Sequence, residues 1–317
     1  MYMVSLLSIL PFTAPACGSA QGGGEAPEAP KVYFVRDITP ENMVRLYEAL
    51  ERPATGKVAV KLSTGEPGGH NFLKPELIKE LVQKVDGTIV ECNTAYGGGR
   101  ASTENHLKAA ADHGFTAIAP VDIMDAEGEV SLPVKGGRHL RENFVGSHYP
   151  AYDFTVVLSH FKGHAMGGFG GAVKNISIGI ASSAGKAWIH SAGKTKNAAQ
   201  MWGNLPAQDD FLESMAEAAK SVADHCGEKI LYINVMNNLS VDCDAHSEDP
   251  KMGDIGILAS TDPVALDKAC VDLVYASPDP GKVHLIERME SRHGIHTLEH
   301  GEAIGLGSQQ YELVELE

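Results

Sequence analysis

Short apolar runs alternate with amphipathic segments along the chain from Lys31 onward. The runs are rich in β-branched residues and favour buried strands, whereas the segments between them repeat apolar residues at helical spacing. Expected strands span residues 31–37, 57–63, 87–93, 115–120, 153–160, 229–236, 255–260 and 311–317. Expected helices span residues 39–50, 74–85, 102–114, 207–227 and 262–277. This alternation predicts the α/β class, with a mostly parallel twisted sheet and helices on both of its faces.

Boundary signals support this reading of the pattern. Thr39 and Asp262 stand at N-cap positions, and each precedes a proline at the first helical position. Residues 125–150 break the alternation and indicate an excursion or a hairpin. We therefore expect one large α/β domain over residues 31–317, with room for a subdomain.

Composition and charge limit the classes of molecule that this protein is expected to bind. The chain has 317 residues, of which 43% are hydrophobic and 21% charged, as in a globular protein with a sizeable core. Its 26 basic and 41 acidic residues give a formal net charge of -15. Such an acidic surface repels polyphosphates, so we expect no nucleic-acid partner. This net charge is still compatible with a small anionic ligand, because a local cluster of lysines makes the potential at one site positive.

The N-terminal segment, residues 1–30, differs in composition from the rest. A short apolar run is followed by the sequence ACGS, which contains Cys17, and then by a tether of Gly, Ala, Pro and Glu. This is the layout of a bacterial lipoprotein signal, with Cys17 lipidated and the tether disordered. It predicts a membrane tether and a lipid-anchored, extracytoplasmic location in the cell envelope. The alternative is a cytoplasmic protein with an odd N-terminus, because no Lys or Arg precedes Lys31.

The stretch HFKGHAMGGFGGAVKN, residues 160–175, concentrates glycine, lysine and histidine. It follows an expected strand, and open α/β sheets bind ligands at the carboxyl ends of their strands. Two nucleotide-binding patterns fail on spacing. Lys174 follows Val173 instead of Gly, which excludes the P-loop pattern. Gly168 and Gly170 are followed by Val173 where the dinucleotide pattern requires glycine.

The remaining chemistry of this stretch is the binding of an anion. Gly168, Gly170 and Gly171 let backbone N–H groups approach a ligand, and Lys162 and Lys174 add cationic donors. These five residues are therefore candidates for binding a cofactor or a small anionic molecule. The alternative is a glycine-rich turn with solvated lysines.

Three histidines fall close together in the sequence, at positions His160, His164 and His190. A neutral imidazole is a common ligand of nickel, zinc and iron, and it also works as an acid or base. The group indicates a metal site or a proton-transfer site, although a lone histidine is more often structural. A second group, HGIHTLEH at residues 293–300, is a weaker metal candidate, because its Gly and Thr disfavour a stable helix.

Three longer blocks resemble the family called domain of unknown function 362. They are LSHFKGHAMGGFGGAVKNISIGIASSAGK, ILYINVMNNLSVDCDA and DIGILASTDPVALDKACVDLV. The resemblance covers nearly all of residues 31–317 and implies an α/β fold without a settled activity. Family members are often labelled iron-sulfur centre proteins. Many have Cys-Asp-Cys where this chain has Cys243, Asp244 and Ala245, which implies Cys243 as a metal ligand.

The cysteines form no local cluster motif. The chain has five of them, without a CxxC pair or a CxxCxxC run. A four-iron cluster would need Cys92, Cys226, Cys243 and Cys270 to converge, or a site shared between subunits. The alternative is that they are buried small hydrophobic residues.

The glycine stretch also resembles, more distantly, the core of the nickel-pincer lactate racemase family. In that family a loop lysine attaches the pincer cofactor covalently, a later histidine binds nickel and another histidine transfers a proton. The matching positions here are Lys174, His190 and His164. The resemblance implies Lys174 and His164 as catalytic residues, with Lys174 also holding the cofactor and His190 binding the metal.

One position departs from the racemase pattern. That family has a second catalytic histidine before an arginine, whereas this chain has Gly99 before Arg100. Racemisation needs a proton donor and a proton acceptor on opposite faces, so this departure argues against lactate racemase activity. His106 is near in sequence, on the next expected helix. Arg100 is a candidate for binding a carboxylate or phosphate, or else a surface arginine in a glycine turn.

The leading hypothesis is an enzyme that binds a metal or an organometallic cofactor. It would act on a small anionic molecule by redox chemistry or by proton or hydride transfer. The metal is unknown, and an iron-sulfur cluster and a nickel cofactor are the two candidates. The alternatives are an iron-sulfur electron-transfer protein with an unknown redox partner, and a lipid-anchored protein that binds a small anion or metal without turnover.

Overall fold

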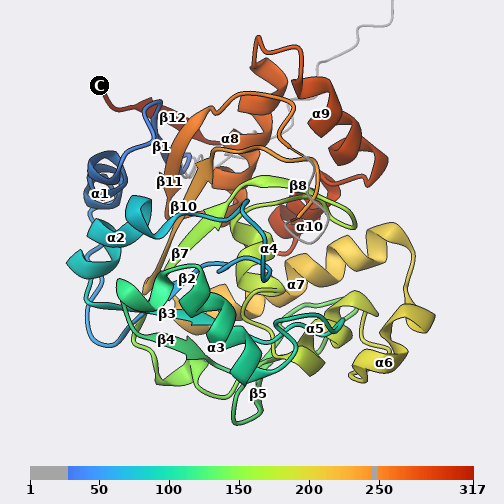
Figure 1. Ribbon diagram of the computed structural model, residues 1–317. Helices are drawn as coiled ribbons and strands as arrows, with labels where there is room; N and C mark the ends of the chain where they lie inside the picture. Colours follow the sequence, from blue (N-terminus) through green and yellow to red (C-terminus); the bar gives the residue numbers. More distant parts are fainter. Residues whose placement is uncertain (1–27, 244–248) are drawn as a thin grey trace, which may run out of the picture.

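An eight-stranded sheet runs through the middle of the protein (Figure 1). The computed structural model describes residues 28–243 and 249–317. The strand order within them is β12-β1-β11-β10-β7-β2-β3-β4. The bounds are β1 (Lys31–Val35), β2 (Val58–Lys61), β3 (Gly87–Glu91), β4 (Val121–Ile123), β7 (Phe154–His160), β10 (Ile230–Met236), β11 (Gly256–Ser260) and β12 (Glu312–Glu315).

The sheet is mostly parallel. Only β11 runs against its neighbours, β1 and β10, and the other neighbouring strands pair in parallel. All seven residues of β10 are buried, as expected for a strand that is covered on both faces. The predicted α/β class is therefore confirmed, as a single domain.

The described residues form ten α-helices and three short 3-10 helices. The α-helices are α1 (Pro40–Ala49), α2 (Pro75–Lys84), α3 (Thr103–Asp112), α4 (Ala172–Ser177), α5 (Ser183–His190), α6 (Ala198–Met201), α7 (Gln208–Cys226), α8 (Pro263–Ala276), α9 (Lys282–Ser291) and α10 (His296–Ala303). The 3-10 helices span Phe115–Ala117, Tyr149–Ala151 and Trp202–Asn204. Two short hairpins lie outside the large sheet: β5 (Glu129–Pro133) with β6 (Glu142–Gly146), and β8 (Lys162–His164) with β9 (Gly168–Gly170).

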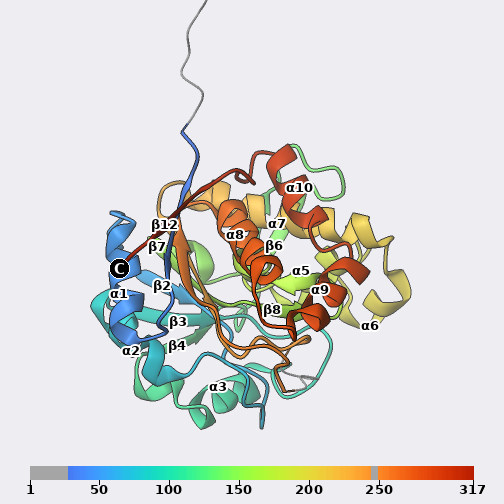
Figure 2. The same cartoon turned by 90° about the horizontal axis from the view of Figure 1, so that it is seen from above.

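Helices cover both faces of the sheet, which is seen from its upper edge in Figure 2. Successive residues of β10 point into different cores. Leu231 and Ile233 pack in the core that contains residues of α1 and α2. Ile230 and Tyr232 pack in the core that contains residues of α4, α7 and α8. This alternation is the period of two expected of a strand, and it makes the sheet the middle of three layers.

Several local expectations hold. The side chain of Thr39 accepts a hydrogen bond from the N–H of Asn42, so it caps α1. Asp262 caps α8 in the same way. The excursion expected over residues 125–150 is the hairpin of β5 and β6.

Two local expectations are wrong. Residues 115–120 do not form a strand, because the chain first makes a 3-10 helix and β4 begins only at Val121. The apolar character of this segment reflects the burial of Phe115, whose ring packs on Phe72 at 5.8 Å between centroids. The segment 293–300 does contain a stable helix, since α10 begins at His296, after the flexible glycine.

The expected membrane tether cannot be placed in this fold. Cys17 and all of residues 1–27 lie outside the described part of the chain. Among the described helices, none has the length and apolar character needed to cross a bilayer.

Candidate functional site

The candidate site lies at the carboxyl edge of the sheet. The strands β10, β7, β2 and β3 are adjacent and parallel, so their carboxyl ends meet at one edge. After β7 the chain forms the β8–β9 hairpin and then enters α4. The glycine-rich stretch is thus a hairpin that leads into a short helix of mostly buried residues.

Asn175 of α4 ties this helix to the ends of the strands. Its Nδ2 atom donates to the carbonyl oxygen of Leu158 at 3.1 Å and to that of Lys61 at 3.3 Å. Its Oδ1 atom accepts from the Nζ atom of Lys61 at 3.0 Å. These bonds fix the position of the neighbouring Lys174 relative to β2 and β7.

A buried carboxylate anchors the other end of α4. Asp267 of α8 accepts the backbone N–H of Ala172 at 2.7 Å and that of Val173 at 3.0 Å. Asn234 of β10 donates to the same carboxylate at 2.7 Å. Burial raises the pKa of Asp267 to about 6, although these hydrogen bonds oppose the rise. Asp267 thus supplies the N-terminal cap that α4 lacks in its own sequence.

His164, Lys174 and His190, the catalytic and metal-binding set implied by the sequence, interact electrostatically, so they lie in one region of the structure. They come from β8, α4 and the end of α5. Burial holds the pKa of His164 well below its usual value, and the nearby charges of Lys174 and His190 lower it further. Burial likewise lowers the pKa of His190 to about 4. Both imidazoles are therefore neutral near pH 7.

The two imidazoles differ in which nitrogen holds the proton. The Nδ1 atom of His190 lies 2.7 Å from the carbonyl oxygen of Lys186 and must donate to it, which leaves the lone pair on Nε2. The Nδ1 atom of His164 accepts the N–H of Gly167 at 2.9 Å and that of Met166 at 3.3 Å. Its proton is therefore on Nε2. His190 has the tautomer of a metal ligand, and His164 that of a proton donor.

Cationic side chains surround this pair. Lys162 and Arg288 both lower the pKa of His164 through their charge, so they lie near it. The Nζ atom of Lys162 also donates to the carbonyl oxygen of Asn71 at 2.9 Å. His160 is half-buried beside Lys162, and burial followed by that charge lowers its pKa to about 3. The surroundings of the site thus favour an anion despite the acidic overall charge.

The glycines of the hairpin pack closely against other parts of the chain. Gly168 has φ +79, and a Cβ atom there would come within 2.9 Å of the Cα atom of Gly294. At Gly171 a Cβ atom would collide with the carboxylate of Asp267, and at Gly170 it would come within 3.1 Å of the Lys174 side chain. Close packing therefore explains why side chains are absent here. Cofactor binding by Gly168, Gly170 and Gly171 stays a prediction.

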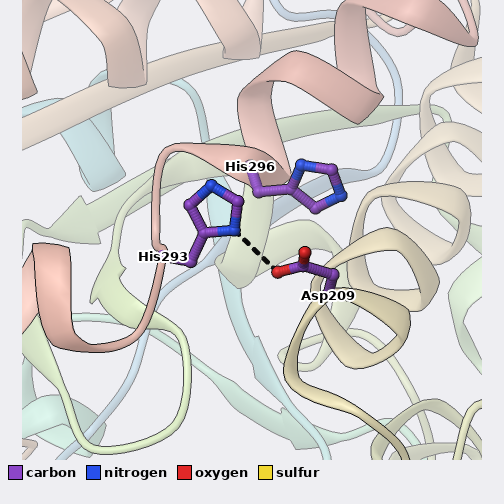
Figure 3. A group of neighbouring side chains, drawn as sticks. All are labelled: Asp209, His293 and His296. Atoms are coloured by element: carbon purple, nitrogen blue, oxygen red, sulfur yellow. Dashed lines mark hydrogen bonds and ion pairs between the residues drawn. The ribbon is translucent and has the colours of Figure 1, made fainter.

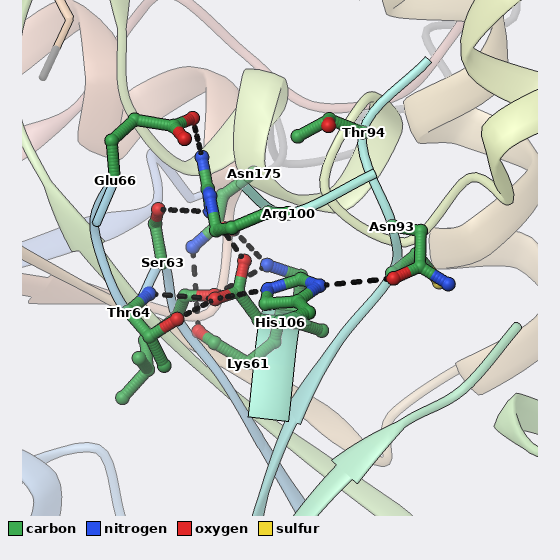
Figure 4. Close-up of polar contacts among 12 residues, drawn as sticks. Lys61, Ser63, Thr64, Glu66, Asn93, Thr94, Arg100, His106 and Asn175 are labelled. Carbon is green, nitrogen blue, oxygen red and sulfur yellow. Dashed lines mark hydrogen bonds and ion pairs between the residues drawn. The ribbon is translucent and has the colours of Figure 1, made fainter. Parts of the chain in front are cut away.

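Arg100 lies in a buried network at the ends of β2 and β3 (Figure 4). Its guanidinium donates to Glu66 at 2.5 Å and to Glu91 at 3.2 Å. Burial and these two carboxylates act in opposite directions, and the carboxylates raise its pKa overall. His106 is fully buried, between Glu91 and Asn93. Arg100 is thus paired with carboxylates of the protein, and anion binding by it stays a prediction.

Two further lysines, Lys61 and Lys186, are buried at this edge of the sheet. Burial lowers the pKa of Lys61 to about 8, and it also lowers the pKa of Lys186. The Nζ atom of Lys186 donates to the carbonyl oxygens of Ala181 at 2.6 Å and Cys92 at 3.3 Å. Lys61 ends an apolar run, VAVK, and a charged residue at the end of a buried strand is the sequence feature that indicates its burial.

The cysteines in the described residues do not converge within one chain. The Sγ atom of Cys226 is 3.0 Å from the Tyr149 hydroxyl, near the amino end of β7, where Thr155 pairs with the first residue of β10. Cys243 follows the carboxyl end of β10, a strand about 20 Å long. Cys92 and Cys270 are buried beside other groups. A cluster shared between subunits and metal binding by Cys243 stay predictions.

Comparison with solved structures finds chains that resemble this one over part of their length and at low sequence identity. The lactate racemase apoprotein from Thermoanaerobacterium thermosaccharolyticum is 14% identical with a TM-score of 0.42, over 89% of this chain and 82% of that one. A structural genomics target from Thermotoga maritima is 14% identical with a TM-score of 0.41, over 74% of this chain and 58% of that one. Comparison with curated proteins found no match.

Family assignment rests on a match that covers most of the chain. The model of the Domain of unknown function (DUF362) family matches residues 58–272. This range contains β2, β3, β7 and β10, the β8–β9 hairpin, and all of α4 and α5. The chain therefore belongs to the DUF362 family.

Proposed function

We propose that this protein is an enzyme that binds a metal or an organometallic cofactor and acts on a small anionic substrate. The observation that carries the proposal is the group of His164, Lys174 and His190, in which His190 is buried, the other two are half-buried and the two neutral imidazoles have opposite tautomers. Neutral imidazole binds nickel, zinc and iron. The amine of Lys174 supplies a group that can attach a cofactor covalently.

Each residue of the group has a distinct role in this proposal. His190 binds the metal through Nε2, with the carbonyl oxygen of Lys186 orienting the ring from behind. Lys174 holds the organic part of the cofactor. His164 exchanges a proton with the substrate through Nε2, because its Nδ1 atom is already occupied by two backbone N–H groups. The bound cofactor would supply the redox or hydride-accepting chemistry that these side chains lack.

The cationic side chains around His164, Lys174 and His190 favour a negatively charged substrate. Lys162 and Arg288 act on His164 through their charges, and both are suited to a carboxylate or a phosphate. Arg100 is held by two carboxylates, so in this proposal it supports the architecture unless a ligand displaces one of them. A small anionic substrate therefore binds beside β8 with Lys162 as its main partner, and Arg288 takes part only if the substrate displaces Asp242, to which its guanidinium donates at 2.9 Å.

The proposed reaction is redox or proton and hydride transfer rather than racemisation. The racemase pattern needs a second catalytic histidine, and Gly99 stands at that position. His106 cannot replace it, because its ring is fully buried between Glu91 and Asn93. The same site could retain a small anion without turnover, and activity measurements on the loaded protein separate these two outcomes.

Attachment of a cofactor at Lys174 is tested by intact mass and visible absorbance of the purified full chain. The wild type should carry an added mass and an absorbance band, and Lys174→Ala should lose both. Lys194→Ala is the matched control, because Lys194 is an exposed lysine that follows the same part of the sequence, four residues after His190. The proposal fails if Lys174→Ala keeps the added mass and the band.

Location at the cell envelope is a separate proposal and depends on Cys17, outside the described residues. A lipoprotein signal of this layout would be lipidated at that cysteine. Labelled palmitate should be incorporated by the wild-type chain in cells and not by Cys17→Ser. Equal incorporation, or none in either chain, would refute the tether.

A further inference from the structure

A second group of metal-ligating side chains lies between the start of α7 and the start of α10 (Figure 3). Asp209 is in the first turn of α7, His296 is the first residue of α10, and His293 is in the preceding loop. One ligand atom of each lies within 4.8 Å of those of the other two. The Nδ1 atom of His293 is 2.7 Å from an Asp209 carboxylate oxygen.

The loop that carries His293 is fixed against α7. Gln208, next to Asp209, donates to the carbonyl oxygen of Arg292 at 2.8 Å. It also lies 2.8 Å from the carbonyl oxygen of Met166, which connects the group to the loop of the β8–β9 hairpin. Three segments that are distant in sequence therefore hold the group in place.

A buried carboxylate stands behind one of the histidines. The side chain of Glu213 is 8% exposed, and its Oε1 atom is 3.1 Å from the Nε2 atom of His296. Its Oε2 atom is 2.6 Å from the Nε2 atom of His139. A carboxylate that accepts one ring N–H of a histidine is the usual support of a metal-binding imidazole. The other ring nitrogen of His296, Nδ1, lies 3.2 Å from a Glu299 carboxylate oxygen, which a bound ion would displace.

The ring geometry disfavours a purely ionic role for the two histidines. Their ring centroids are 5.0 Å apart and the rings are nearly parallel, at 14°. Two imidazolium ions stacked in this way would repel each other, which disfavours both rings being charged at once. The side chains of His293 and Asp209 are about half exposed, at 52% and 49%, which gives an ion access from solvent.

We propose that Asp209, His293 and His296 form a binding site for a divalent transition metal ion, with Zn²⁺ as the best fit. Two imidazoles and one carboxylate match the ligand set of zinc sites that keep an open coordination position. Ca²⁺ and Mg²⁺ are poor fits because they prefer oxygen ligands alone. An ion here would join α7 to α10 next to the glycine hairpin.

Zinc titration of the full-length protein by calorimetry, after treatment with EDTA, tests this site. The wild type should bind about one Zn²⁺ that His190→Ala does not remove. His293→Ala and His296→Ala should each weaken this binding at least about ten-fold. His300→Ala is the matched control, because His300 is also in α10 and also pairs with a carboxylate, Glu217, at 3.3 Å.

The outcomes separate this site from its neighbours. Loss of zinc binding in both His293→Ala and His296→Ala, with retention in His300→Ala, supports the assignment. Unchanged binding in these two variants overturns it. Loss only in His139→Ala also overturns it, because that result would assign the ion to the adjacent group of His139, Asp210 and Glu213.

Discussion

The Nδ1 atom of His190 lies 2.7 Å from the carbonyl oxygen of Lys186, one turn earlier in α5. A carbonyl oxygen only accepts hydrogen bonds, so this contact fixes the proton on Nδ1 and the lone pair on Nε2. The ring also stacks on Phe211, with centroids 5.2 Å apart. Together these contacts restrict the imidazole ring to one orientation before any metal binds.

Nitrogen NMR of the two imidazoles tests the tautomers directly. His190 should give the pattern of a neutral ring protonated at Nδ1, and His164 that of a neutral ring protonated at Nε2. Burial lowers both pKa values, to about 4 for His190, so neither ring should titrate as pH falls from 8 to about 5. Titration of either ring near its ordinary pKa would contradict the structure.

Asp267 should be needed to hold α4 in place. Asp267→Ala leaves the N–H groups of Ala172 and Val173 without their buried acceptor, so the free energy of unfolding should fall by about 2–3 kcal/mol. Urea denaturation measures this loss. Asp279→Ala is the control, because Asp279 also accepts two backbone N–H groups but does so at the surface, and it should cost less than about 1 kcal/mol. Equal losses would argue against the anchoring role.

Gly163 should tolerate no side chain. A Cβ atom there would collide with the carbonyl oxygen of Val241, so Gly163→Ala should lower the free energy of unfolding by about 1–3 kcal/mol. Gly203→Ala is the control, because no atom lies within 4 Å of its added Cβ, and its effect should stay within about 1 kcal/mol. A neutral Gly163→Ala variant would show that the β8 backbone can move away from Val241.

Lys61 should make stability depend on pH in the alkaline range. Burial lowers its folded-state pKa from 10.5 to about 8, so between these values the unfolded chain binds a proton that the folded chain has released. The contribution of Lys61 to stability therefore rises with pH over this window and is constant below it, where the folded and unfolded chains both bind the proton. Relative to Lys61→Met, the wild type should gain about 1 kcal/mol between pH 7 and pH 9, measured by urea denaturation. A flat difference, as expected for exposed Lys194→Met, would contradict the shift.

Most of the fold could be predicted from the sequence because its signals are local. The strand at β10 and the helix at α7 follow directly from apolar runs and helical spacing. The segment over residues 115–120 could not be read in this way, because the burial of Phe115 is a tertiary effect that looks like a strand pattern. The direction of β11, which runs against both of its neighbours in the large sheet, likewise depends on pairing that no local signal specifies.

The candidate site was predictable only in part. The glycine stretch drew attention to His164 and Lys174, the group of three histidines added His190, and the family resemblance implied their roles. The anchoring role of Asp267 was not predictable, because it lies 95 residues from Ala172 in sequence and reaches α4 only through the fold. The pairing of Arg100 with Glu91 is likewise a product of burial, which a charge in a glycine-rich turn does not reveal.

Elemental analysis of the anaerobically purified protein tests the central claim most directly. The wild type should contain a metal ion that His190→Ala loses, because Nε2 of His190 is the proposed ligand. Exposed His225→Ala and the second-site variant His293→Ala should both retain that ion. If His190→Ala keeps the same metal in the same amount as the wild type, the proposed site is wrong.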